Sequence, residues 1–62
     1  MLWKLHITYQ TGEPVTLEGG ERLLRGVAEA LWEDRVNEAV MRLELWNPNG
    51  ELEDVHEQLA PH

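Results

Sequence analysis

Apolar and polar residues alternate one by one along the first part of the chain, over residues 2–10. The apolar positions that would share one side are Trp3, Leu5, Ile7 and Tyr9. Alternation with a period of two is typical of a β-strand with one buried face. Residues 11–14 carry turn-forming residues, and residues 15–18 alternate again. The two runs therefore predict an antiparallel hairpin.

The spacing of apolar residues changes after the glycine pair at residues 19–20. From Glu21 to about Val36 the apolar residues return at helical spacing. The positions that would line one helical face are Leu24, Val27, Ala28 and Leu31. This pattern predicts an amphipathic helix of about 14–16 residues.

Alternation resumes over residues 39–46 and predicts a third strand. One side of it would carry Ala39, Met41, Leu43 and Leu45. The other side would carry Val40, Arg42, Glu44 and Trp46. Residues 47–50, with the sequence Asn-Pro-Asn-Gly, predict a turn in which Pro48 takes the second position and Asn-Gly supplies the left-handed residue.

The pattern after the turn, over residues 51–62, is open to two interpretations. Residues 51–53 could pair back as a short fourth strand. Residues 54–57 match a capping box, which favours a helix start. We expect a short strand, then about one turn of helix, then a frayed end.

These elements predict one α+β domain over residues 1–62. A right-handed connection through the helix would place the third strand beside the first and parallel to the second. The expected antiparallel sheet has the strand order 2-1-3, or 2-1-3-4 if the tail pairs. The helix would pack on one face of this sheet, and only the tail could cover the other face.

Charge narrows the choice of partners. The 62 residues hold five Lys or Arg and twelve Asp or Glu, giving a net charge of −7. Such a chain is a poor ligand for nucleic acid or for an anionic membrane, whereas a basic protein surface would attract it. The alternative is that the charge only keeps a small protein soluble.

The N-terminal pattern does not resemble a signal peptide, and no apolar stretch approaches the roughly 20 residues of a membrane span. We therefore expect a cytoplasmic protein.

The residue types in the chain give little support for a catalytic site or a metal site. The chain contains no cysteine and no serine, and its three histidines are far apart in sequence: His6, His56 and His62. Threonine is the remaining hydroxyl nucleophile, and the sequence offers it no evident base partner. We expect no enzyme activity, no cofactor, no metal and no small-molecule substrate.

The uncovered sheet face would carry a candidate contact patch for a protein partner, because tryptophan beside arginine is typical of interface anchors. Its residues would be Trp46, Arg42, Val40 and His6. The alternative is that residues 52–60 fold back and bury Trp46. Carboxylates late in the helix are candidate secondary contacts: Glu29, Glu33, Asp34 and Glu38. They could instead form a solvated face, or part of an acidic strip that mimics nucleic acid.

In size, acidity and element order over residues 2–46, the chain resembles the small ββαβ proteins of bacteriophages and mobile elements. Some of those proteins inhibit host enzymes by surface contact. The resemblance implies an inhibitor or regulator that acts by surface contact. Combined with the acidic charge, it favours a non-catalytic protein-interaction module that binds a basic partner. Unpaired edge strands also favour a second hypothesis, a homodimer formed through an edge or through the open sheet face.

Overall fold

A computed structural model describes residues 1–33 and 39–58 as a sheet with one helix. The elements in chain order are β1 (Trp3–Tyr9), β2 (Val15–Gly19), α1 (Glu21–Glu33), β3 (Val40–Trp46) and β4 (Leu52–Glu57). All neighbouring strands pair antiparallel, in the order β2-β1-β3-β4. The α+β class and the strand order that includes a fourth strand are therefore confirmed.

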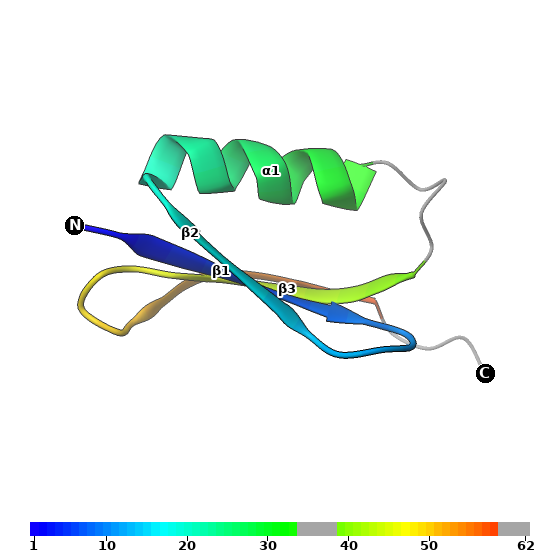
Figure 1. Ribbon diagram of the computed structural model, residues 1–62. Helices are drawn as coiled ribbons and strands as arrows, with labels where there is room; N and C mark the ends of the chain where they lie inside the picture. The colour runs from blue at the N-terminus through cyan, green and yellow to red at the C-terminus, as the bar shows by residue number, and fades with distance from the viewer. Residues whose placement is uncertain (34–38, 59–62) are drawn as a thin grey trace.

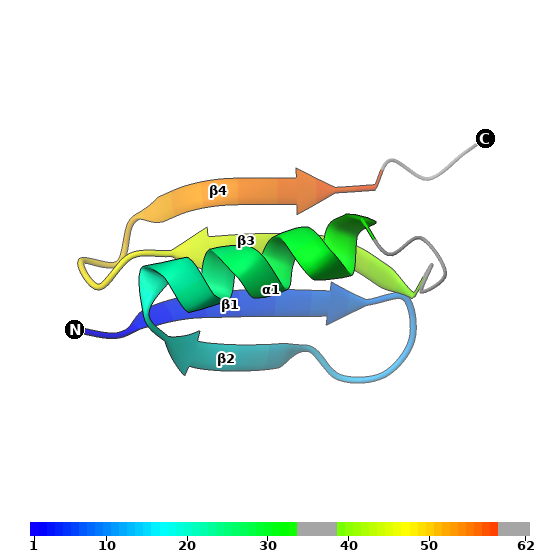
Figure 2. The ribbon, with the colours of Figure 1, turned by 90° about the horizontal axis from the view of Figure 1, so that it is seen from above.

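The helix lies on one side of the sheet, and Figure 1 shows no element among the described residues on the other side. Seen from the helix side, α1 runs over β1 and β3, while β2 and β4 form the two outer strands (Figure 2). The predicted end of the helix near Val36 lies outside the described residues.

The core lies between α1 and the two central strands. Its buried side chains are Leu5, Ile7, Leu24, Ala28, Val40, Leu43 and Leu45. Leu24 and Ala28 are separated by one helical turn, so both point onto the sheet. The alternation of β1 places Leu5 and Ile7 in the same buried cluster, as the sequence predicts.

Val40 is a correction to the sequence prediction. It was expected on the uncovered face beside Trp46, but its side chain is 1% exposed and belongs to the core. The cause is a β-bulge in the β1–β3 pairing, where Thr8 is opposite Arg42 but Tyr9 is opposite Val40. Met41 is the extra residue, and one extra residue reverses the alternation of sides. Val40 is therefore not part of an exposed contact patch.

The tail is a second correction. Residues 54–57, predicted as a helical turn, belong to β4 and pair with β3. The turn before them directs the chain back along β3. The Asn47 side-chain oxygen accepts hydrogen bonds from the backbone N–H groups of Asn49 and Glu51, both at 2.9 Å. Gly50 takes the left-handed conformation with a φ of 83°, as the sequence predicts.

Candidate contact surfaces

The sheet face turned away from the helix, which we call the open sheet face, is built from three rows of side chains that the strand register aligns. The first row is Glu18, Lys4, Trp46 and Leu52. The second row is Thr16, His6, Glu44 and Val55, and the third is Thr8, Arg42 and Glu57. Three of the four predicted contact residues, Trp46, Arg42 and His6, thus share this face.

Trp46 forms an apolar cluster with two residues of β4. It pairs directly with Leu52, and Val55 follows on the same side of β4. Leu52 is 41% exposed and Val55 is 37% exposed. The alternative in which residues 52–60 fold back over Trp46 is therefore contradicted for residues 52–57, because these residues extend the sheet instead. Leu59, which was expected to join that covering segment, lies outside the described residues.

Arg42 is held by two carboxylates of its own sheet. Its Nε and Nη2 atoms donate to the Glu44 Oε2 at 3.1 and 3.0 Å, and its Nη1 donates to Glu57. The bond to Glu57, and secondly the bond to Glu44, raises the pKa of the Arg42 guanidinium above its usual value. Arg42 therefore joins β3 to β4 and stays charged at any physiological pH.

His6 is joined to Thr16 across β1 and β2, with 3.0 Å between the His6 Nδ1 and the Thr16 Oγ1. The sequence offers no evident base partner for threonine, and the structure corrects this by placing the His6 ring beside the Thr16 hydroxyl. A nucleophile and its base also need groups that bind the developing oxyanion and a space for the substrate. The pair lies on an exposed sheet face, and the groove formed by described residues is on the opposite side of the sheet.

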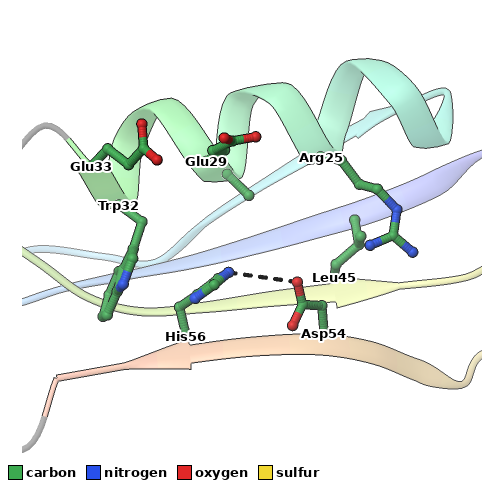
Figure 3. Close-up of a pocket in the computed structure, with 8 residues that line it drawn as sticks. Arg25, Glu29, Trp32, Glu33, Leu45, Asp54 and His56 are labelled. Atoms are coloured by element: carbon green, nitrogen blue, oxygen red, sulfur yellow. Dashed lines mark ion pairs between the residues drawn. The ribbon is translucent and has the colours of Figure 1, made fainter.

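That groove lies between α1 and β4 and has a volume of about 280 Å³. Its lining residues are Arg25, Ala28, Glu29, Trp32, Glu33, Leu45, Asp54 and His56. Figure 3 shows the Trp32 and His56 rings side by side, with their centroids 5.2 Å apart and an interplanar angle of 32°. The His56 Nε2 also lies 3.5 Å from the Asp54 Oδ2.

The sequence pattern does not reveal the groove, because residues 54–57 also match the start of a helix. Paired as a strand, Asp54 is opposite Leu45 and His56 is opposite Leu43, so both point toward α1. The available signal was the strong turn at residues 47–50, which favours a hairpin and hence alternating sides in the segment that follows.

The predicted contact residues are divided between the two sides of the sheet. Glu29 and Glu33 line the groove, whereas Trp46, Arg42 and His6 lie on the open sheet face. Asp34 and Glu38 lie outside the described residues. Within residues 1–33 and 39–58, no three His, Asp or Glu side chains are grouped so that they could hold a metal ion.

The charge is also unevenly divided. Among residues 1–33 and 39–58, the basic residues on the open sheet face are Lys4 and Arg42. The acidic residues that the strand register places on it are Glu18, Glu44 and Glu57. Most of the net negative charge therefore comes from residues outside this face.

Comparison with known proteins found no matching family model, no matching curated protein and no matching solved structure. In the part of the chain that the structure describes, α1 is too short and too polar to cross a membrane.

Proposed function

We propose that the protein is a non-catalytic protein-interaction module that docks a partner protein on its open sheet face. The observation that carries this proposal is the apolar cluster of Trp46, Leu52 and Val55 on a face that no described element covers. Interface centres are rich in tryptophan surrounded by a polar rim. Lys4, Glu44 and the Arg42 ion pairs supply such a rim here.

The net charge of −7 makes a basic partner the best match, with inhibition or regulation of that partner as the role. Because the open sheet face is close to neutral, the carboxylates elsewhere would act at a distance. They would speed the encounter with a basic protein, while the apolar cluster would hold the complex together. The resemblance to small acidic phage proteins agrees with this role and, like a cytoplasmic location, stays a prediction.

The test compares substitutions on opposite sides of the sheet. The wild-type protein is first used to capture and identify a partner, whose affinity is then measured with purified components. The same measurement is made with Trp46→Ala on the open sheet face and with Glu33→Gln in the groove. We expect Trp46→Ala to weaken binding by a factor on the order of 30 or more, as for an interface hot spot, and Glu33→Gln to leave it nearly unchanged.

The reverse pattern, a loss with Glu33→Gln alone, would move the contact to the groove and contradict docking on the open sheet face. Unchanged affinity in both variants would contradict both surfaces. Circular dichroism of each variant verifies that the fold is kept, so that a loss of binding reports the contact and not unfolding.

A further inference from the structure

The two edges of the sheet differ in how they are protected against pairing with another chain. Natural edge strands are commonly protected by charged side chains, by bulges and by charges that point inward. β4 has all three: carboxylates at Glu53, Asp54 and Glu57, a register shift against β3, and Asp54 pointing toward the helix side. These features protect the β4 edge against pairing with a strand of another chain.

β2 has little of this protection. Its pairing with β1 runs without a register shift, and Glu18 is its one charged residue. Toward the helix side it presents Val15 and Leu17, which pair with the buried Ile7 and Leu5 of β1. Yet Val15 is 41% exposed and Leu17 is 37% exposed, because α1 lies over β1 and β3 and leaves this outer edge open (Figure 2).

A third exposed apolar residue lies beside this edge. Leu23, in the first turns of α1, is 63% exposed. A Cβ built on Gly19 would lie 3.3 Å from the Leu23 Cδ2 atom, so Leu23 lies directly over the glycine at the end of β2. Val15, Leu17 and Leu23 thus form an apolar strip along the β2 edge.

The sequence of β2 is complementary to itself when read antiparallel. With a two-fold axis at Leu17, Leu17 is opposite Leu17 of a second copy, and Thr16 is opposite Glu18. Val15 is opposite Gly19, over which the Leu23 side chain lies. No like charges are then directly opposite each other, and each apolar residue of the strip meets an apolar residue or a glycine.

We propose that two copies of this chain pair edge to edge through β2, antiparallel about a two-fold axis at Leu17. The pairing forms one continuous sheet across both copies. It satisfies the outward backbone N–H and C=O groups of β2 and covers Val15, Leu17 and Leu23 in both copies. A chain of 62 residues buries only about 60% of the surface that its unfolded chain exposes, a lower share than in larger domains, so this added burial contributes substantially to its stability.

This interface uses neither the cluster around Trp46 nor the groove. The open sheet faces of the two copies lie side by side on the same surface of the joined sheet, so both remain free. A result that contradicts the dimer therefore leaves the proposed docking function untouched, and the reverse also holds.

The first test measures the mass of the protein by sedimentation equilibrium in a concentration series that reaches the millimolar range. Two substitutions with the same initial exposure are compared, Leu17→Lys on β2 and Val55→Lys on β4. We expect Leu17→Lys to raise the dimer dissociation constant by a factor on the order of 100, because two lysines become opposed and the contact between the two Leu17 side chains is lost. Val55→Lys should change it by less than about threefold, since β4 is remote from the interface.

The second test uses the absence of cysteine from the chain. Paired residues on antiparallel strands have Cα atoms about 4.5–5.5 Å apart, within the range that a disulfide bridges. A single Leu17→Cys substitution should therefore cross-link into a covalent dimer under mild oxidation, and the matched Val55→Cys should not. Because cysteine is close to leucine in polarity, this variant remains informative if Leu17→Lys fails to fold.

A wild-type mass that stays monomeric throughout the concentration series would overturn the proposal. The proposal would also be overturned by a dimer that dissociates with Val55→Lys but persists with Leu17→Lys, since that result places the interface on the open sheet face. Equal cross-linking of the two cysteine variants would contradict the two-fold axis at Leu17.

Discussion

Two glycines of this chain have opposite structural roles although they are the same residue. Gly26 is in the middle of α1 and exposed, and a Cβ built on it would meet no other atom within 4 Å. Gly50 has equally open surroundings, but its φ of 83° belongs to the left-handed region. At Gly26 the absence of a side chain only weakens the helix, whereas at Gly50 it permits the turn.

Alanine substitutions at these two positions should therefore have effects of opposite sign. We expect Gly26→Ala to raise the free energy of unfolding by about 1 kcal/mol, the difference in helix propensity. Gly50→Ala should lower it by about 1–2 kcal/mol, because alanine is strained at that φ. Urea denaturation followed by circular dichroism measures both values. A destabilised Gly26→Ala variant would show that the surface around Gly26 needs the glycine, for example for a close contact with a second chain.

At the scale of elements, the β3–β4 hairpin depends on a single side chain. Asn47 accepts two backbone hydrogen bonds through its side-chain oxygen and donates one from Nδ2 to the Glu53 Oε2 at 2.8 Å. Its backbone N–H and C=O also bond to Glu51 and Gly50. Since the hairpin carries β4, these bonds position both the Leu52–Val55 half of the apolar cluster and the outer wall of the groove.

Replacement of Asn47 by alanine should lower the free energy of unfolding by about 1–2 kcal/mol, because the N–H groups of Asn49 and Glu51 lose their acceptor. Asn47→Asp is the matched control, since it keeps the acceptor oxygen; it replaces the donation to Glu53 by repulsion between two carboxylates, which added salt screens. We expect the aspartate variant to be closer to wild type in thermal denaturation. Equal melting temperatures for wild type and Asn47→Ala would contradict this role for the side chain.

Much of the fold could be predicted because the two central strands and α1 have clear periodicity. The alternation of Leu5 and Ile7, and the helical spacing of Leu24 and Ala28, are direct consequences of which side is buried. The side of Val40 could not be predicted, because a bulge adds one residue without a distinct sequence signal. The groove was missed for a related reason: residues 54–57 satisfy both a helix-capping pattern and a strand, and pairing with β3 decides between them.

At the scale of the whole molecule, the dominant property is a net charge of −7 that lies mostly outside the open sheet face. This charge acts differently on the two proposed associations. It attracts a basic partner, and it repels a second copy of the same chain.

Added salt should therefore move the two affinities in opposite directions. Between roughly 50 and 500 mM salt, the association rate with a basic partner should fall by about tenfold, because screening removes the long-range attraction. The dimer dissociation constant should decrease over the same range, because screening weakens the repulsion between copies. Stopped-flow mixing and sedimentation equilibrium measure the two quantities. A partner association rate that is independent of salt would argue against a basic partner.

The placement of the three tryptophans gives the protein a built-in optical probe. Trp3 and Trp32 are on the helix side, where Arg25 lies 5.7 Å from the centroid of the Trp3 ring and His56 lies beside Trp32. Trp46 is on the opposite side, in the proposed docking cluster. A partner that excludes water from that indole shifts its emission to shorter wavelength, so complex formation can be followed in unlabelled protein. With Trp46 replaced by phenylalanine, the same titration loses that component of the signal.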